Sequence, residues 1–218
     1  MTVKAVILAA GKGTRMLPLT ETNPKPLLPS IENSLLLSQI NFLRTITDDI
    51  TVTIGYKKEL LIHALKLYSV NQYIYGKDKE NAFWINSKKF RNYAGPLIVC
   101  TCDNMLDINL EKLIEEYYSR GEKSLLVGLN KYEKEADKVS VEKHKIIEIG
   151  KNVKSDIILS GIQILNIHDI QKYDQNFSTF HNLWKRLATE DKLILSKINI
   201  ESWSAIDTVK ELHEYFNL

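Results

Sequence analysis

The sequence predicts one α/β domain with a Rossmann-like, three-layer α/β/α architecture and a mostly parallel sheet. Apolar, strand-like runs alternate with helical patterns through the first two thirds of the chain, which is typical of strands joined by crossover helices. The 218 residues are enough to build one sizeable core. No linker rich in proline, glycine or serine and no internal repeat divides the sequence. We therefore predict a single domain over residues 1–218.

The first two thirds supply the strands and helices of the predicted sheet layers. Buried strands are expected at residues 3–10, 50–55, 72–75, 96–102 and 124–129, where apolar and β-branched residues are concentrated. Between them, residues 35–45, 58–67 and 110–118 carry apolar side chains at three-to-four spacing. That spacing places one apolar stripe along each helix and indicates that these helices cover the sheet.

The pattern changes from residue 139 onward. Short strands are expected at residues 139–141, 145–149 and 157–165, joined by tight polar turns. They predict a small antiparallel addition over one end of the sheet. A helix at 179–188, a strand at 193–200 and a closing helix at 208–216 complete the prediction.

The bulk composition excludes several classes of function. The formal net charge is only +2, with no extended basic cluster, so nucleic acid and anionic membranes are poor candidates for partners. No apolar run reaches about 18 residues and no secretory segment precedes the first strand. Cys100 and Cys102 fall on one face of a predicted strand, and the five histidines lack zinc-ligand spacing. We expect a cytoplasmic protein without a disulfide framework.

The segment 8–29, LAAGKGTRMLPLTETNPKPLLP, is the most informative part of the chain. It follows the first predicted strand. Gly11 and Gly13 let backbone N–H groups approach an anion without interference from a Cβ atom. Arg15 follows closely, and Lys25 lies between two prolines that we expect to hold it in extended geometry. A strand, a glycine turn and two fixed cations are suited to binding phosphate.

Two commoner glycine motifs do not fit this segment. A Walker A loop would need a glycine shortly before Gly11, and the dinucleotide fingerprint would need a third glycine where Met16 stands. The segment instead resembles the signature of the sugar-phosphate nucleotidyltransferases, also called nucleotide-sugar pyrophosphorylases. It matches their pattern G-x-G-[ST]-R-x(4)-T-x(3)-P-K-P at every defined position. It is also similar to the smaller cytidylyltransferases that act on phosphocholine.

The resemblance implies the nucleotide-diphospho-sugar transferase fold, with residues 1–130 binding the nucleotide and residues 131–218 binding the acceptor. It also implies the reaction. A phosphate oxygen of a sugar 1-phosphate would attack the α-phosphorus of a nucleoside triphosphate in line, and pyrophosphate would leave with the assistance of Mg²⁺.

On this resemblance, each motif residue has an expected role. Arg15 and Lys25 would be catalytic, and Asp103 and Asp207 would hold Mg²⁺. A strand-closing turn at Asp103 and a helix N-cap at Asp207 are the structural alternatives. The expected nucleotide-binding residues are Leu8, Ala9, Ala10, Gly11, Gly13, Thr14, Asn81 and Asp103. Lys151 and Gly161 would bind the acceptor, although Gly150 and Asn152 depart from the family pattern around Lys151.

Other functions stay open at this stage. One is a cytidylyltransferase that acts on phosphocholine or another non-sugar phosphomonoester, with Trp184 and Glu142 as contributors to a cage for the cation. Another is a catalytically silent nucleotide-sensing subunit, which the presence of Arg15, Lys25, Asp103 and Asp207 disfavours. The sequence does not identify the nucleobase, the acceptor or the pathway. Family members are often oligomeric, so a homo-oligomer is a further expectation.

Overall fold

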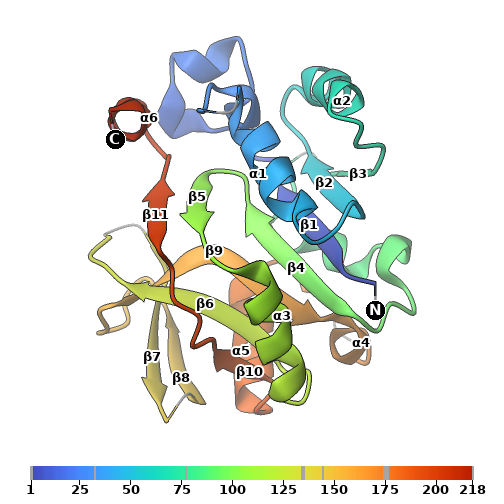
Figure 1. Cartoon of the computed structure of the whole chain (residues 1–218), viewed down its shortest axis with the longest axis vertical. Helices are drawn as coiled ribbons and strands as arrows, with labels where there is room; N and C mark the ends of the chain where they lie inside the picture. The colour runs from blue at the N-terminus through green and yellow to red at the C-terminus, as the bar shows by residue number, and fades with distance from the viewer. Residues whose placement is uncertain are drawn as a thin grey trace.

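The computed structural model describes residues 2–31, 33–76, 78–133, 136–143, 145–173 and 177–217. A nine-stranded sheet runs through it in the order β3-β2-β1-β4-β9-β6-β10-β8-β7. Figure 1 shows α1 and α3 in front of this sheet and α5 behind it, which gives three layers. The predicted α/β class with a mostly parallel sheet is confirmed.

One side of the sheet consists of parallel strands. These are β1 (Lys4–Leu8), β2 (Ile50–Ile54), β3 (Tyr73–Tyr75) and β4 (Pro96–Thr101). Helices α1 (Leu35–Arg44), α2 (Lys58–Leu67) and α3 (Leu110–Ser119) occupy the three predicted helical segments. Ser34 begins α1 because its hydroxyl accepts a hydrogen bond from Leu37 N at 3.2 Å.

The other side of the sheet is mixed, and here one prediction is wrong. Strand β9 (Ile157–Asn166) does not join an addition at the end of the sheet but lies between β4 and β6 (Ser124–Asn130), antiparallel to both. Its second half, residues 162–165, is buried at every position and so on both faces, as expected of a central strand. Only β7 (Lys138–Glu142) and β8 (Lys145–Gly150) form the antiparallel edge.

The C-terminal segments also differ in part from the predictions. The expected strand 193–200 ends early, as β10 (Leu193–Leu195). Just after this strand, the carboxylate of Glu116 accepts hydrogen bonds from Ser196 Oγ and Lys197 N. These bonds hold the chain in place where the strand ends. Helices α5 (Phe180–Thr189) and α6 (Val209–Phe216) match their predicted segments, and the short helix α4 (Ile167–Ile170) was not predicted.

A second, two-stranded sheet was also not predicted. It consists of β5 (Asn104–Asp107), which follows β4 directly, and β11 (Ser202–Ala205), which is antiparallel to it. Figure 1 shows this ribbon beside the edge where β4 ends.

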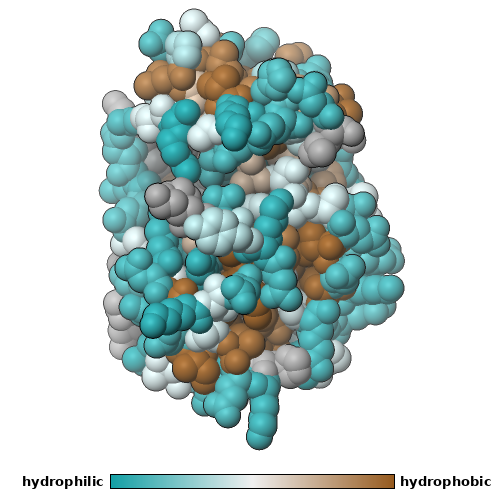
Figure 2. All heavy atoms as spheres, turned by 90° about the vertical axis from the view of Figure 1, so that its left-hand side faces the viewer, coloured by the Kyte–Doolittle hydropathy of each residue, from teal (hydrophilic) through white to brown (hydrophobic). Residues whose placement is uncertain are grey.

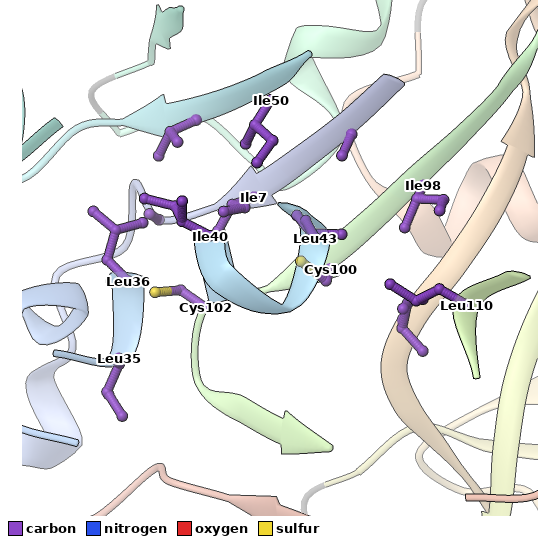
Figure 3. Packing of buried hydrophobic residues seen from close by; sticks show 14 of the residues in the cluster. Ile7, Leu35, Leu36, Ile40, Leu43, Ile50, Ile98, Cys100, Cys102 and Leu110 are labelled. Carbon is purple, nitrogen blue, oxygen red and sulfur yellow. The ribbon is translucent and has the colours of Figure 1, made fainter. Parts of the chain in front are cut away.

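The sheet separates two apolar clusters, and β4 contributes to both by alternation. Ile98 and Cys100 pack in the cluster beneath α1 with Ile7, Ile40 and Leu43 (Figure 3). The neighbouring residues on the strand, Leu97 and Val99, belong to the opposite cluster, which α5 covers with Leu183 and Leu187. Cys100 and Cys102 lie in the same cluster, as predicted from their spacing.

Within the described residues, no helix combines the length and apolarity that a membrane span requires.

Candidate functional site

A cavity of about 510 Å³ opens at the carboxyl ends of β1 and β4. Its size is within the range of small-molecule sites. Its lining includes Leu8 at the end of β1, Asp103 in the turn after β4 and the glycine turn, together with residues of β9, α5 and β11. The cavity therefore lies at the edge of the sheet where ligands bind in open α/β folds.

The glycine turn packs directly on Lys25. Gly13 has φ +63°, and a Cβ atom at this position would lie 2.8 Å from Lys25 Cβ. The hydroxyl of Thr20 donates a hydrogen bond to the Gly13 carbonyl at 3.0 Å. Two positions of the sequence pattern thus fix the turn against the lysine. Lys25 itself begins the short 3₁₀ turn Lys25–Leu27, so the expected extended geometry at this residue is wrong.

Four charged side chains from distant parts of the chain meet at this edge. Lys25 Nζ lies 2.6 Å from Asp103 Oδ2 and 2.8 Å from Asp207 Oδ1. Arg15 Nη2 lies 2.9 Å from the same oxygen of Asp207. The side chain of Lys25 is only 12% exposed, whereas that of Arg15 is 55% exposed. Arg15 is therefore the cation that an incoming anion can reach most freely.

The electrostatics of Lys25 follow from this arrangement. Burial disfavours the charged ammonium, but the carboxylates of Asp103 and Asp207 outweigh burial and raise the pKa of Lys25 above the ordinary lysine value. The lysine is therefore a permanent cation at physiological pH.

The β5–β11 ribbon brings the two aspartates together. Asp103 occupies the turn between β4 and β5, and Ala205 of β11 is paired with Asn104 of β5. The Ile206 N–H donates a hydrogen bond to the Asp103 carbonyl at 2.9 Å, which places Asp207 next to the turn. Asp207 is not the N-cap of α6, because Thr208 fills that role in a capping box with Glu211.

The aspartate pair suits a magnesium ion. One cation, the Lys25 ammonium, already contacts both carboxylates, so their oxygens face a common point. No group of three or more histidine, cysteine or acidic side chains with metal-binding geometry occurs in the described part of the chain. Mg²⁺ often takes only one or two protein carboxylates and completes its coordination with water and phosphate oxygens. Asp103 and Asp207 fit that requirement.

Most of the other expected site residues line the same cavity. These are Leu8, Ala9, Gly11, Gly13, Thr14, Asn81 and Gly161. The Oδ1 atom of Asn81 accepts a hydrogen bond from Phe180 N at 3.0 Å, which ties the loop before the 3₁₀ helix 83–86 to the start of α5.

Two expected residues do not line this cavity. The Ala10 carbonyl accepts a hydrogen bond from Tyr56 N at 3.2 Å instead of facing it. Lys151 follows β8 at the far edge of the sheet and lines a separate hollow with His181 and Lys185. The structure therefore does not bring Lys151 to the cavity that the other expected residues line. Glu142, considered for a choline cage, does not line the cavity either.

Several cavity residues carried no sequence signal that singled them out. Glu133 and Asp137 come from the segment between β6 and β7, and Gln163 is a polar residue within the apolar strand β9. Asn104 Nδ2 donates hydrogen bonds to Thr101 Oγ1 at 2.6 Å and to Asp103 Oδ1 at 3.3 Å, and so orients the aspartate.

The tryptophans divide into two groups. Trp184 and Trp203 line the cavity, and both donate hydrogen bonds to β9. The Trp184 indole donates to Gln163 Oε1, and the Trp203 indole donates to the Ser160 carbonyl. Trp84 is buried in the core against Phe90.

The face beside the glycine turn is partly apolar. Figure 2 shows apolar surface at the upper end of this face, where Figure 1 places residues 11–31 and α6. Exposed apolar side chains of these segments include Leu17, Leu19 and Phe216.

Comparisons with known proteins show which family and which folds this chain resembles. The sequence model of the nucleotidyl transferase family matches residues 4–144. The bifunctional protein GlmU of Methanococcus aeolicus is 29% identical over 164 residues, which cover 72% of this chain and 39% of that protein. The match thus spans less than half of that relative's length.

Solved structures match over almost the whole chain. A protein assigned as a glucose-1-phosphate thymidylyltransferase of Bacillus anthracis superposes with a TM-score of 0.83 at 19% identity, covering 98% of this chain and 94% of the other. At that identity the likeness shows the fold alone. The CTP:phosphocholine cytidylyltransferase of Streptococcus pneumoniae superposes with a TM-score of 0.77 at 25% identity, covering 98% of this chain and 97% of the other.

Proposed function

The chain belongs to the nucleotidyl transferase family, and from that premise we propose that it transfers a nucleoside monophosphate from a nucleoside triphosphate to a sugar 1-phosphate. The products would be a nucleotide-sugar and pyrophosphate. One observation carries the proposal. Arg15, Lys25, Asp103 and Asp207 form a continuous ionic network in the lining of a cavity of about 510 Å³.

The proposed roles follow from charge and position. The backbone N–H groups of residues 11–14 and the exposed guanidinium of Arg15 bind the departing β- and γ-phosphates. Lys25 neutralises charge at the α-phosphate, which matters because two polyanions must approach each other. The acceptor phosphate is already ionised near neutral pH, so the reaction needs no general base.

We propose Asp103 and Asp207 as the protein ligands of Mg²⁺. When bound, the ion supplies charge neutralisation and a template for the phosphate groups. Asn104 supports this role by holding one oxygen of Asp103 at 3.3 Å. Since both carboxylates contact Lys25 in the structure, the lysine must leave them, at least in part, when it turns toward phosphate.

The acceptor is proposed to occupy the part of the cavity formed by residues 131–218 of the single domain. Glu133, Asp137, Trp184 and Trp203 line this part. Carboxylates accept hydrogen bonds from hydroxyl groups, and aromatic faces pack against sugar rings. The cytoplasm, which contains nucleoside triphosphates and Mg²⁺, is the proposed location.

Pyrophosphate release from a panel of substrates tests the proposal. Each nucleoside triphosphate is combined with glucose 1-phosphate, mannose 1-phosphate or phosphocholine in the presence of Mg²⁺. Release with a sugar 1-phosphate, abolished in Asp103→Asn, supports it. Binding of a triphosphate without release from any combination would instead favour the silent nucleotide-sensing subunit.

A second candidate is transfer to phosphocholine. The same carboxylates and tryptophans that suit a sugar could surround a quaternary ammonium group, which binds to aromatic faces and acidic side chains. Release with phosphocholine and with no sugar 1-phosphate would establish this alternative.

A further inference from the structure

Gln163 is an unusual residue for its place in the fold. It lies on the central strand β9, paired with Val99 of β4 and Leu126 of β6. Gln163 is only 6% exposed, yet it lines the cavity. A polar side chain in the middle of a nine-stranded sheet requires hydrogen-bond partners to offset its loss of hydration.

The orientation of its carboxamide is fixed by Trp184. The indole Nε1–H lies 2.8 Å from Gln163 Oε1 and can only donate a hydrogen bond. The amide oxygen must therefore face the indole, and the Nε2 group with its two hydrogens faces the other way. Among the residues that the structure describes, none accepts a hydrogen bond from Nε2.

Apolar side chains form part of the lining of the same cavity. Leu126, Leu159 and Phe180 line the same cavity, and Phe180 stacks on Trp184 with ring centroids 5.7 Å apart and 13° between the planes. Because Nε2 is not among the buried side-chain atoms without a partner, it is accessible from the cavity, where a ligand that offers an oxygen can accept its hydrogen bond.

We propose that Gln163 is a specificity residue that donates a hydrogen bond from Nε2 to a hydroxyl oxygen of the acceptor's sugar ring. This inference rests on the proposed function and deepens it. A hydroxyl group both accepts and donates, so the amide donor complements the carboxylate acceptors of Glu133 and Asp137. A trimethylammonium group has no lone pair to accept the amide hydrogen. Gln163 therefore selects a polyhydroxyl acceptor over phosphocholine.

Gln163→Met tests this role because methionine has a similar shape and no hydrogen-bond donor. We expect the KM for the sugar 1-phosphate that the wild type uses to rise about tenfold, with the KM for the nucleoside triphosphate little changed, as the loss of one buried hydrogen bond predicts. An unchanged acceptor KM, or a rise confined to the triphosphate KM, would overturn the inference.

The substitution also leaves the Trp184 indole without its acceptor, so a matched pair is needed. Trp184→Phe removes the indole N–H, and the double variant Gln163→Met/Trp184→Phe differs from it only at Gln163. We expect the acceptor KM to differ about tenfold within this pair as well. Equal KM values within the pair would show that Gln163 acts only through the tryptophan and would overturn the role.

Singly deoxygenated analogues of the same sugar 1-phosphate identify the contacted hydroxyl. One analogue should raise the wild-type KM about tenfold and cause no further rise in Gln163→Met. If every analogue raises the KM equally in both proteins, Gln163 contacts none of these hydroxyls. If the wild type releases pyrophosphate with any sugar 1-phosphate, the proposed function stands whatever the outcome for Gln163. Release with phosphocholine alone would overturn both the proposed function and the role of Gln163.

Discussion

The ammonium of Lys25 lies 2.6 Å from the carboxylate of Asp103, a residue 78 positions further along the chain. It also contacts Asp207, so a protein cation stands between the two carboxylates proposed to hold a metal ion. The ammonium and a divalent ion should therefore compete for the same oxygens.

This competition predicts that Lys25→Met binds Mn²⁺, used in place of Mg²⁺, more tightly than the wild type when no nucleotide is present. Removal of the ammonium frees Asp103 from its ion pair and leaves Asp207 with the Arg15 contact, so we expect the Kd to fall at least about threefold. Isothermal titration calorimetry measures it. Lys123→Met is the matched control, because Lys123 forms an ion pair of the same 2.6 Å length with Asp191 outside the cavity. Equal or weaker binding in Lys25→Met would show that the two cations do not compete.

Turnover should respond in the opposite direction. Lys25→Met and Asp103→Asn are each expected to reduce kcat for pyrophosphate release by about 10²-fold or more, since each removes charge stabilisation from the transition state. Circular dichroism should show an intact fold, and Lys123→Met should retain normal kcat. A kcat near the wild-type value in either site variant would remove that residue from the mechanism.

Gly161→Ala should destabilise the protein through two separate effects. Gly161 has φ +88°, and a Cβ atom there would lie 2.7 Å from both Asn104 Nδ2 and Thr101 Oγ1. Gly121→Ala is the control, because its φ of +70° is similarly strained but no heavy atom lies within 4 Å of the added Cβ. We expect losses of about 3 kcal/mol and about 1 kcal/mol respectively, measured by urea unfolding. Similar losses in both variants would mean that the Asn104 contact contributes little.

The capping box at α6 should stabilise the segment that carries Asp207. Glu211 Oε2 accepts hydrogen bonds from Asp207 N at 2.8 Å and from Thr208 N at 2.7 Å. Thr208→Ala should lower the free energy of unfolding by about 1 kcal/mol, whereas Thr208→Ser keeps the hydroxyl and should stay close to wild type. If the serine variant loses as much stability as the alanine variant, the methyl group of Thr208 and not its hydroxyl is responsible.

Alkaline pH should weaken the fold partly through Cys100. Burial, and then the charge of Asp103, raise the pKa of this thiol from 9.0 to about 12. Because the folded-state pKa is the higher one, this contribution to stability is complete below pH 9.0 and is lost as pH rises toward about 12. Unfolding free energies over that range should fall less steeply in Cys100→Ala, by up to about 1.4 kcal/mol per pH unit. Identical slopes would contradict the raised pKa.

The sequence predicts the parallel half of the fold well, for local reasons. Segment 50–54 consists of β-branched residues and segment 96–100 of apolar ones, and the helices between the strands carry regular apolar stripes. The family resemblance is confirmed by the match to the family model. It could be recognised from the sequence because its motif lies in one short segment whose glycines and prolines have fixed spacing.

The missed features depend on pairings between distant segments. The four-residue strands β5 and β11 mix polar and apolar residues, and only their mutual register places Asp207 beside Asp103. Whether Gln163 faces core or cavity depends on which strands flank β9. A signal for β9 did exist, since the segment is longer than β7 and β8 and six of its ten residues are isoleucine or leucine.

The late position of β11 has a consequence for biosynthesis. The ribosome must extend the nascent chain to Asp207 before both carboxylates can meet, because that residue reaches the turn only through the ribbon with β5. On the proposed roles, an incomplete chain therefore lacks one of the two carboxylates for Mg²⁺, and a magnesium nucleotide stabilises it less than it stabilises the finished site. The early strands would then fold mainly through their apolar contacts, before the ribbon completes the proposed site.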